Sequence, residues 1–328
     1  MNAVDLAGKN ISEHEAIRKV IDAQARIKSL QDEVKALKQD RNDLLLEHED
    51  YKSRRKVTSL QKPKPKTGGD YIRVSFGDMH GCLMDKPAVA ALLEDIRKLD
   101  PDEIVLGGDM LECGGFLARH QPIGFVATSE YSYQDDIEAC NWFLDELAKA
   151  APKAEVIYLE GNHEDRIERW IVDVVRAAGR DAEFLLQLNS PQTTLKIAER
   201  GIVYVRRQYV EGGLPPGWVK RGKMYFTHEL GSGVNGASKA IAKTAGNVTF
   251  FHTHQESAAT QVFPSVGIVK AFCPGCLCER QPLWRHSNPT NWSHGYGIDI
   301  IAQSGNFQHI SVPIWEGESL GTVLVNRK

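Results

Sequence analysis

The stretch YIRVSF at residues 71–76, followed by GDMHG at residues 77–81, is where the fold of this chain can first be read. An apolar run of six residues that ends at a glycine predicts a buried strand, which delivers polar side chains at its C-terminal end. Asp78 and His80 stand two residues apart, so in an extended or turning backbone their side chains leave on the same side. A carboxylate and an imidazole on one face suit a divalent metal ion.

The same order of strand, polar end and helix is predicted twice more downstream. The apolar run at 103–106 leads into GGDMLEC, and the run at 156–159 leads into GNHEDR. In open α/β sheets, ligands bind at the C-terminal edge of the strands. Amphipathic periods predict the helices of this half over 87–99, 134–150 and 165–178.

The second half of the chain changes character. Strand-like runs dominate from residue 201 to residue 313, and only 237–245 has a helical pattern. The chain therefore opens as α/β and closes largely as β, which predicts two sheets packed together with helices outside.

Side chains that can bind metal ions recur at the predicted strand ends. They stand in the segments GDMHG, GGD, GNHE, FTHE and FHTH, and include five of the eleven histidines. Any one of these histidines could be an ordinary core or surface residue, but all five in such contexts predict a single site. The full set is Asp78, His80, Asp109, Asn162, His163, His228, His252 and His254.

In this order the segments resemble the calcineurin-like metallophosphoesterase superfamily, whose pattern runs D-x-H, G-D, G-N-H-D/E, H and G-H-x-H. The resemblance covers about residues 71–315 and implies a four-layer α/β/β/α sandwich of two mixed sheets. Two departures are visible: Thr227 and Phe251 stand where the family often has Gly before the next histidine. The segments PGCLC at 274–278 and NWSHGYGI at 291–298 resemble those of phage or prophage-type members.

The resemblance implies two divalent metal ions. The first would be held by Asp78, His80, Asp109 and His254. The second would be held by Asp109, Asn162, His228 and His252, with the Asp109 carboxylate bridging. This mixture of ligands suits Mn²⁺, Fe or Zn²⁺ more than Mg²⁺ alone, and we expect Mn²⁺. Two such ions lower the pKa of a bridging water, and the resulting hydroxide is expected to attack phosphorus in line.

The resemblance also assigns roles beyond the metal ligands. It places His163 at the leaving-group oxygen rather than on a metal ion, a role that typically contributes about 10²–10⁴-fold. Glu112 stands three residues after Asp109, where many family members have an Asp that orients this histidine. Glu112 either does the same here or is a surface carboxylate. Arg166, Arg206 and Arg207 are candidate substrate contacts.

Three cysteines crowd together at 273, 276 and 278. C-x-x-C is a zinc-ligand spacing, but no second such pair follows. A turn near the rim of the active site is the favoured interpretation, and a structural zinc ion is the alternative.

The N-terminal residues 1–56 form a segment of their own. A helix is predicted from residue 11 to about residue 56, with a heptad seam that places Ile27 and Val34 at a and Leu30 and Leu37 at d. This choice favours a parallel two-stranded coiled coil and hence a homo-oligomer. A helix lying against the catalytic domain is the alternative.

A Pro- and Gly-bearing basic linker is predicted over residues 57–69, VTSLQKPKPKTGG, and the catalytic domain over 70–328. The basic stripe that begins at Lys52 and continues through the linker is either a solvated connection or a contact for a phosphate backbone.

The composition sets outer limits. The chain has 328 residues, 42% hydrophobic, and a net charge of -3, which excludes a globally basic nucleic-acid binder but allows local basic patches. The sequence contains no run of about 18 apolar residues, so a membrane-spanning helix is not expected. The N-terminus has no signal-peptide pattern, and the six cysteines are irregularly spaced, so we expect the cytoplasm of a bacterium or of a phage-infected host cell.

Three functions fit this sequence. The first is a phosphodiesterase or nuclease acting on DNA or RNA, favoured by the basic residues Lys196, Arg200, Arg206, Arg207, Lys220, Arg221 and Lys223. The second is a phosphomonoesterase for small molecules or phosphoproteins. The third is a non-catalytic scaffold that retains the fold, against which the intact ligand set argues. Specificity resides in loops, so the sequence does not separate the first two.

Overall fold

The computed structural model describes residues 22–24, 26–32, 35, 57–61, 71–118, 131–233, 235–282, 289–319 and 321. The chain divides into two compact units, Met1–Lys56 and Val57–Lys328. In the first unit, the described residues are helical, and the side chains of Ile27 and Leu30 are exposed. The other seam positions, Val34 and Leu37, lie outside the described residues, so the coiled coil stays a prediction.

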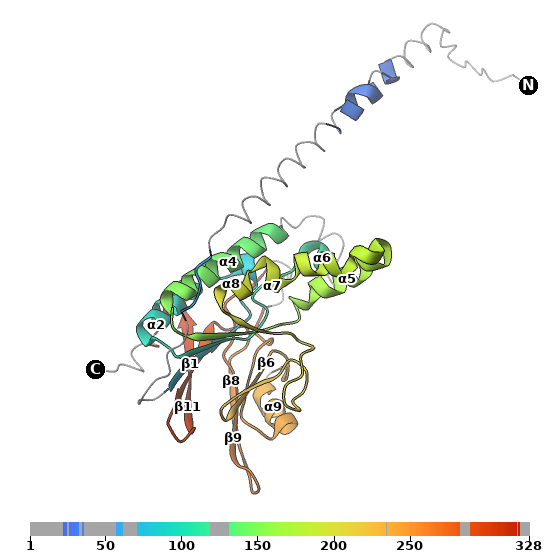
Figure 1. The fold of residues 1–328 in the computed structure, drawn as a ribbon. Helices are drawn as coiled ribbons and strands as arrows, with labels where there is room; N and C mark the ends of the chain where they lie inside the picture. The colour runs from blue at the N-terminus through green and yellow to red at the C-terminus, as the bar shows by residue number, and fades with distance from the viewer. Residues whose placement is uncertain are drawn as a thin grey trace, which may run out of the picture. The chain divides into compact units, whose positions relative to one another are not determined.

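The larger unit is built on two mixed β-sheets (Figure 1). The first has seven strands in the order β12-β11-β10-β1-β2-β3-β4. Its strands β1 to β4 pair in parallel, and the remaining pairs are antiparallel. The bounds are β1 (Tyr71–Phe76), β2 (Glu103–Leu106), β3 (Glu155–Leu159), β4 (Val203–Val205), β10 (Gly295–Ile301), β11 (Phe307–Trp315) and β12 (Glu318–Ser319).

The second sheet has five strands in the order β5-β6-β7-β9-β8. Strands β6, β7 and β9 are parallel neighbours, and the two outer strands pair antiparallel. The bounds are β5 (Val219–Arg221), β6 (Met224–Thr227), β7 (Val248–Phe250), β8 (Ser257–Phe263) and β9 (Gly267–Cys273).

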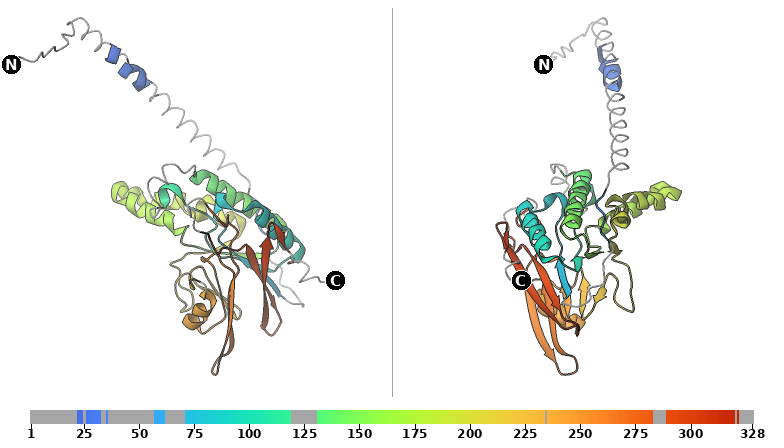
Figure 2. Two further views of the ribbon diagram at one scale, coloured as in Figure 1. Left: turned by 180° about the vertical axis from the view of Figure 1, so that it is seen from behind. Right: turned by 60° about the vertical axis from the view of Figure 1, so that its left-hand side comes forward.

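Helices cover the outer face of each sheet, which gives four layers (Figures 1 and 2). The helices are α2 (Lys86–Leu99), α4 (Tyr133–Ala150), α5 (Asp165–Ala178), α6 (Ala182–Asn189), α7 (Pro191–Thr194), α8 (Ile197–Arg200) and α9 (Gly236–Thr244). Helices α2 and α4 share a core with the seven-stranded sheet, and α9 shares one with the five-stranded sheet. None of the described helices is both long and apolar enough to span a membrane.

The strand alternation explains how the layers form. In β2, Ile104 and Leu106 pack toward the helices, whereas Val105 belongs to the core between the sheets. On the other side of that inter-sheet core stand Phe226 and Phe272. Successive side chains of a strand point to opposite faces, so a fully apolar strand can serve two cores. The predicted α/β fold with two mixed sheets is therefore confirmed.

Most predicted elements lie where the sequence placed them, within a few residues. The helices α6, α7 and α8 and the strands β5 and β12 were not predicted. They are two to eight residues long, too short for a hydrophobic period to identify them.

Residues 57–61 contact the larger unit although they were expected to belong to a linker. The Leu60 N–H donates to Arg200 O at 2.9 Å, and the Gln61 N–H donates to Pro152 O at 2.7 Å. Leu60 also packs against the main core. This part of the predicted linker is thus part of the catalytic unit, and residues 62–70 lie outside the described residues.

The basic residues between 196 and 223 do not form one surface, which corrects the sequence interpretation. Arg200 is only 1% exposed, and its Nη1 lies 2.6 Å from Asp145 Oδ1. Its guanidinium also donates to Asn141 Oδ1 at 3.0 Å and to Leu195 O at 2.9 Å. Arg200 therefore joins α8 to α4 inside the fold and cannot contact a substrate.

Replacing this buried cation should destabilise the protein. Arg200→Met removes the buried cation that pairs with the Asp145 carboxylate, so we expect the free energy of unfolding to fall by about 3 kcal/mol. Urea unfolding followed by circular dichroism measures the change. Arg206→Met is the matched control, because its ion pair with Glu168 is exposed and should contribute less than about 1 kcal/mol. Equal losses in the two variants would contradict the structural role of Arg200.

Candidate metal centre

The candidate ligands stand on loops at one edge of the sandwich. Asp78, Asp109 and Asn162 follow the parallel strands β1, β2 and β3, and His228 and His252 follow the parallel strands β6 and β7. The C-terminal ends of parallel strands meet at the same edge of a sheet. Backbone hydrogen bonds then join neighbouring loops.

The backbone of the candidate centre is strained at five ligand positions. The φ angles are positive at Asp78 (52°), His80 (56°), Asp109 (50°), His252 (73°) and His254 (57°). A left-handed conformation at a non-glycine residue costs on the order of 1 kcal/mol or more, and such residues cluster at functional sites. Five of them within one ligand set indicate that this backbone is shaped for binding rather than for stability.

Three members of the first predicted ligand group lie close together. His80 Nε2 lies 3.1 Å from His254 Nε2, which in turn lies 3.3 Å from Asp78 Oδ1. The far nitrogens are held from behind, His80 Nδ1 by Glu112 Oε2 at 2.6 Å and His254 Nδ1 by Cys278 Sγ at 3.6 Å. Such partners set which imidazole nitrogen is free to bind a metal ion.

The second predicted group converges beside the first. His228 Nε2 lies 3.2 Å from Asp109 Oδ2 and 3.0 Å from Asn162 Oδ1. His228 Nδ1 donates to Gly107 O at 2.7 Å, which aims Nε2 at the ligand cluster. Ligand atoms of Asp109, His228 and His252 all lie within 4.8 Å of one another.

The centre fits divalent cations. Asp78 Oδ1 is fully buried, and it lies 3.3 Å from His254 Nε2 without forming a well-aligned hydrogen bond to any residue that the structure describes. A buried carboxylate oxygen needs a positive partner, and two imidazole nitrogens 3.1 Å apart need a proton or a metal ion between them. Carboxylate, amide and imidazole ligands suit first-row divalent metals. Asp78 would serve the first ligand group, and Asp109 would serve both.

Without metal ions, the charges of the carboxylates and imidazoles shift one another's pKa values. Burial lowers the pKa of His228, but Asp109 and Asp78 outweigh burial and raise it to about 10. The pKa of Asp109 is held well below its usual value, because His163 and His228 outweigh the effect of burial. A histidine must be neutral to bind a metal ion, so binding at His228 releases a proton and strengthens as the pH rises.

Glu164 is a positioning residue that the sequence analysis did not identify. Its carboxylate is buried and accepts hydrogen bonds from the backbone N–H groups of Asp109 (3.0 Å) and Gly161 (2.9 Å). It also accepts from the Tyr158 hydroxyl at 2.8 Å and from two further N–H groups of the loop after β2. Glu164 is the fourth residue of the segment GNHE, so its place beside the candidate ligand Asn162 is the signal in the sequence. Glu164 holds the loops after β2 and β3 together.

Gly161 allows this close approach. An added Cβ would stand 2.1 Å from Asp109 Oδ1. Any side chain at residue 161 would therefore displace the carboxylate that serves both ligand groups.

Glu112 contacts both His80 and His163, and it holds them by different groups. Its carboxylate Oε2 lies 2.6 Å from His80 Nδ1 and 3.3 Å from His163 Nδ1. The His163 ring is held more closely by the Glu112 carbonyl oxygen, 2.6 Å from Nδ1. Glu112 is 5% exposed, so the alternative of a surface carboxylate is wrong. That Glu112 orients His163 in the reaction stays a prediction.

A second buried acid supports Glu112. Asp136 on α4 accepts hydrogen bonds from the N–H groups of Glu112 (3.1 Å) and Cys113 (2.9 Å) and from the Tyr131 hydroxyl (2.9 Å). Burial raises the pKa of Asp136 to about 6. Asp136 lies 27 positions from Asp109 in the sequence, and no local motif marks it.

The three candidate arginines have different surroundings. Arg166 is buried, donates to Glu112 O at 3.0 Å, and places Nη2 2.7 Å from His163 Nε2. Arg207 forms ion pairs with Glu229 and, at 3.5 Å, with Asp165. Arg206 pairs with Glu168 and is more exposed. Of the three, Arg166 is the one that touches a catalytic candidate.

Phe251 departs from the family pattern, and two glycines next to it leave space for its larger side chain. A Cβ added at Gly107 would stand 2.2 Å from the Phe251 ring, and one at Gly77 would stand 3.1 Å from it. The two glycines thus leave room for the ring. It is fully buried between the sheets, next to the candidate ligand His252.

The cysteine segment lies against the centre, as the favoured interpretation expected. Cys273, Cys276 and Cys278 are buried free thiols. The Leu277 N–H donates to Asp78 O at 3.1 Å. Among the described residues, Cys278 is close enough to His80 and His254 to share a metal ion with them, and no such set is formed by the three cysteines. The geometry does not favour a zinc ion held by the cysteines alone.

Removing one ligand charge should weaken metal binding without unfolding the protein. Asp78→Asn keeps the size of the side chain but loses the buried anion, so we expect metal affinity to fall at least about tenfold. Isothermal titration with Mn²⁺ and elemental analysis of the purified protein measure the loss. Asp100→Asn, at the end of α2, is the control with the same chemical change. Full retention of two ions by Asp78→Asn would exclude Asp78 as a ligand.

Comparison with known proteins agrees with this geometry. The sequence model of the calcineurin-like phosphoesterase family matches residues 74–274. No curated protein matches the chain. Among solved structures, the chain resembles the phosphoesterase Yfce from E. coli at 17% identity and a TM-score of 0.31, covering 73% of this chain and 98% of that one.

Two further solved structures are similar. Vacuolar protein sorting 29 from Cryptosporidium parvum matches at 10% identity and a TM-score of 0.38, covering 77% of this chain and 95% of that one. A Vps29 single mutant from Entamoeba histolytica matches at 9% identity and a TM-score of 0.30, covering 73% and 98%. The family match spans most of the larger unit and contains every segment of the candidate ligand set. The chain belongs to the calcineurin-like phosphoesterase family and is a metal-dependent phosphoesterase.

Proposed function

We propose that the chain hydrolyses phosphodiester bonds of nucleic acid with two divalent metal ions, Mn²⁺ first and Fe or Zn²⁺ as alternatives. The observation that carries this proposal is the convergence of seven candidate ligands beside His163 and Arg166. When bound, the ions supply an activated water and neutralise charge on the phosphoryl group. The remaining chemistry rests on residues of the chain.

The charge around the centre favours a diester over a monoester. A phosphomonoester carries up to two negative charges near neutral pH, whereas a diester carries one. Arg207 and Arg206 are each offset by carboxylates, Arg207 by two of them. Arg166 donates to the carbonyl oxygens of Glu112 and Cys113, at 3.0 and 3.2 Å, and lies 3.9 Å from the Glu112 carboxylate. This modest positive charge suits a singly charged substrate.

His163 is placed to assist the leaving group. Burial lowers the pKa of His163, but Asp109 and Glu112 outweigh burial and raise it. At 2.7 Å, Arg166 Nη2 donates to His163 Nε2 while His163 Nδ1 donates to Glu112 O, which is the arrangement of a neutral ring. For His163 to act as a proton donor, the two side chains would have to separate, and a leaving oxygen would then receive the proton from His163 Nε2 and a hydrogen bond from Arg166.

Substrate assays separate the three functions. Purified protein with Mn²⁺ should hydrolyse bis-p-nitrophenyl phosphate and single- or double-stranded DNA or RNA faster than p-nitrophenyl phosphate. Cleavage of the monoester alone would support a phosphomonoesterase and contradict the proposal. If the metal-loaded protein cleaves none of these substrates, the scaffold becomes the better explanation.

The role of His163 has its own signature. We expect His163→Asn to lower kcat on DNA by about 10²–10⁴-fold at unchanged metal content. The loss on bis-p-nitrophenyl phosphate should be smaller, because p-nitrophenolate leaves without being protonated. Parallel kinetics on the two substrates, with elemental analysis, measure both effects. Full turnover of DNA by His163→Asn would exclude the assigned role, and equal losses on both substrates would exclude proton donation.

We also propose that the N-terminal helix makes the protein a homo-oligomer. The seam residues Ile27 and Leu30 are exposed in the single chain, where a coiled-coil partner would cover them. We expect light scattering to show a dimer or larger assembly, and Leu30→Lys to shift it toward the monomer. Lys28→Ala, outside the seam, should leave the mass unchanged. A monomeric unmodified chain at micromolar concentration would contradict the proposal.

A reducing compartment is the proposed location. The six cysteines are all free thiols, which fits the cytoplasm of a bacterium or of a phage-infected cell. The segments at 274–278 and 291–298 support a phage or prophage-type member of the family.

A further inference from the structure

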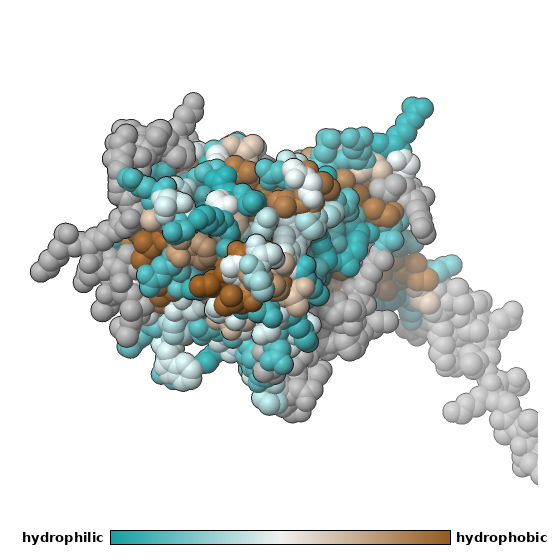
Figure 3. Space-filling model, turned by 90° about the horizontal axis from the view of Figure 1, so that it is seen from below, coloured by the Kyte–Doolittle hydropathy of each residue, from teal (hydrophilic) through white to brown (hydrophobic). Residues whose placement is uncertain are grey.

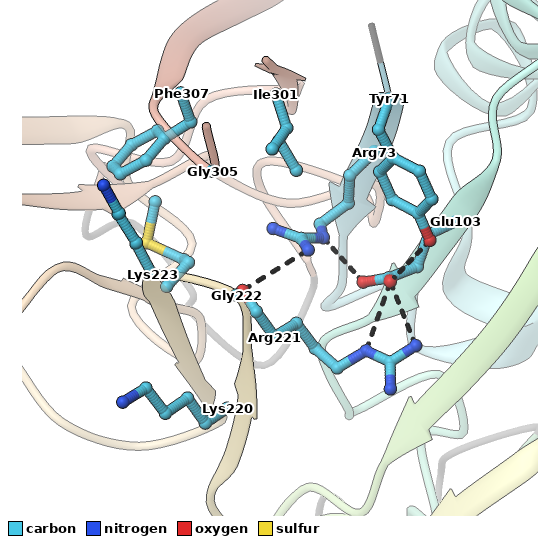
Figure 4. Close-up of a pocket in the computed structure, with 11 residues that line it drawn as sticks. Tyr71, Arg73, Glu103, Lys220, Arg221, Gly222, Lys223, Ile301, Gly305 and Phe307 are labelled. Atoms are coloured by element: carbon cyan, nitrogen blue, oxygen red, sulfur yellow. Dashed lines mark hydrogen bonds and ion pairs between the residues drawn. The ribbon is translucent and has the colours of Figure 1, made fainter. Parts of the chain in front are cut away.

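A cavity lies at the N-terminal end of β1, and the metal centre follows the other end of this strand. Figure 4 shows the residues that line the cavity. It measures about 300 Å³ and is bounded by the start of β1, the β5–β6 turn and the β10–β11 hairpin. Arg73 and Asp78 are five residues apart along this strand and its loop, about 17 Å in an extended chain. The cavity is therefore a separate site from the metal centre.

Buried ion pairs form the floor of this cavity. Glu103 accepts from Arg73 Nε at 2.6 Å, from Arg221 Nε at 3.1 Å and from the Tyr71 hydroxyl at 2.9 Å. Arg73 is 4% exposed and also pairs with Asp299 at 3.3 Å. These carboxylates, together with Glu155 beside Arg221, offset the two arginines.

Two lysines add positive charge that these carboxylates do not offset. Lys220 Nζ lies over the Tyr225 ring, 5.2 Å from its centroid, and Lys223 Nζ donates to Asn306 Oδ1 at 2.7 Å. Among the described residues, no carboxylate lies within ion-pair distance of either lysine. Each ammonium group therefore keeps donors available for an anion.

The cavity continues into a wider groove of about 670 Å³. The two share Lys220, Lys223 and Phe307, and the groove adds Lys270 and Asn247 without any acidic residue among its lining. Its apolar wall includes Val266 and Ile268 at the β8–β9 turn, where exposed apolar residues gather. The view from below shows hydrophobic patches set within hydrophilic surface at this end of the unit (Figure 3).

We propose that this cavity and groove bind the phosphate of a nucleotide, with Lys220 and Lys223 on the phosphate and an aromatic side chain beside the base. The combined space is large enough for one nucleotide. Lysines bind phosphates as point charges, and aromatic rings stack on bases of any sequence. Phe307, which lines both the cavity and the groove, is the aromatic side chain placed to do so. The nucleotide is either free or part of a nucleic-acid strand, since the chemistry is the same.

The type of turn supports this placement. β5 and β6 are joined by the two residues Gly222 and Lys223, and Gly222 has a φ of 62°. A glycine at the first central position of a two-residue hairpin loop is typical of the tight type II′ turn. Such a turn presents Lys223 on a short, well-defined connection rather than on a long loop.

Binding is best tested in EDTA, where the metal centre is empty and hydrolysis does not occur. The probes are adenosine 5′-monophosphate by isothermal titration and a fluorescent 15-residue oligothymidylate by anisotropy. We expect the double variant Lys220→Ala/Lys223→Ala to bind at least one probe about tenfold more weakly at low salt. For the oligothymidylate, the slope of log affinity against log salt should fall by about 1.4, or 0.7 for each lost contact.

The matched control removes two charges elsewhere. Lys98→Ala/Lys149→Ala changes exposed lysines at the ends of α2 and α4, on the helical face of the seven-stranded sheet, and should bind both probes like the unmodified chain. Equal affinities in the two double variants would overturn the proposal, and so would the absence of binding by the unmodified chain. Adenosine serves as the probe without phosphate, and binding as tight as that of the monophosphate would also overturn it.

The two probes identify the source of the phosphate. Lysine-dependent binding of the monophosphate indicates a site for free nucleotides, and lysine-dependent binding of the oligothymidylate alone indicates a strand. The proposal does not depend on nuclease activity, because binding is measured without metal. Hydrolysis of bis-p-nitrophenyl phosphate with Mn²⁺ should be unchanged in Lys220→Ala/Lys223→Ala.

Discussion

The fold of the larger unit is organised around a largely buried polar site at which two carboxylates, an amide and four imidazoles converge, with His252 on its exposed side. Such a group is unfavourable by itself, because Asp78 Oδ1 lacks a well-aligned hydrogen bond from the described residues and His80 Nε2 faces His254 Nε2 at 3.1 Å. Without metal, protons offset part of the charge, as the raised pKa of His228 shows. With metal, cations would do so more completely. Five left-handed ligand residues add on the order of 1 kcal/mol of strain each. The centre therefore has to be held in place by the rest of the fold.

What holds it is a set of buried acids behind the ligands. Glu164 accepts hydrogen bonds from the loops after β2 and β3, and Asp136 accepts from the loop that carries Glu112. Glu112 in turn fixes the His80 ring from behind. Each of these acids accepts hydrogen bonds from backbone, imidazole or hydroxyl donors, and the ligand atoms that face the metal site stay available for the ions. This division separates the residues that bind from the residues that position, and the two kinds look alike in the sequence.

That similarity explains how far the sequence could predict the structure. Strand ends such as GDMHG were identifiable because an apolar run and a short metal-binding pattern coincide, and the ligand set followed from five such coincidences. Arg200 was misread as a surface cation, because only the packing of α8 on α4 shows that it is buried beside Asp145. The role of Asp136 depends on where α4 lies relative to the loop after β2, which no spacing encodes. Short elements such as β5 have too few residues for a period to show.

The separation of charge along the strands is the last consequence of this architecture. β1 carries Arg73 near one end and leads to Asp78 at the other, and β6 leads from the turn at Lys223 to His228. The lysines beside the cavity are exposed, and about 17 Å of extended chain, roughly two Debye lengths at physiological salt, separates that end from the ligand cluster, so screening weakens the interaction between the two ends. The anionic ligand cluster can thus attract cations while the lysines at the opposite end attract anions. A net charge of -3 hides both, because opposite local fields cancel in the sum. Along β1 and β6, the end of the strand at which a residue lies therefore decides whether it is close to a site for cations or to a site for anions.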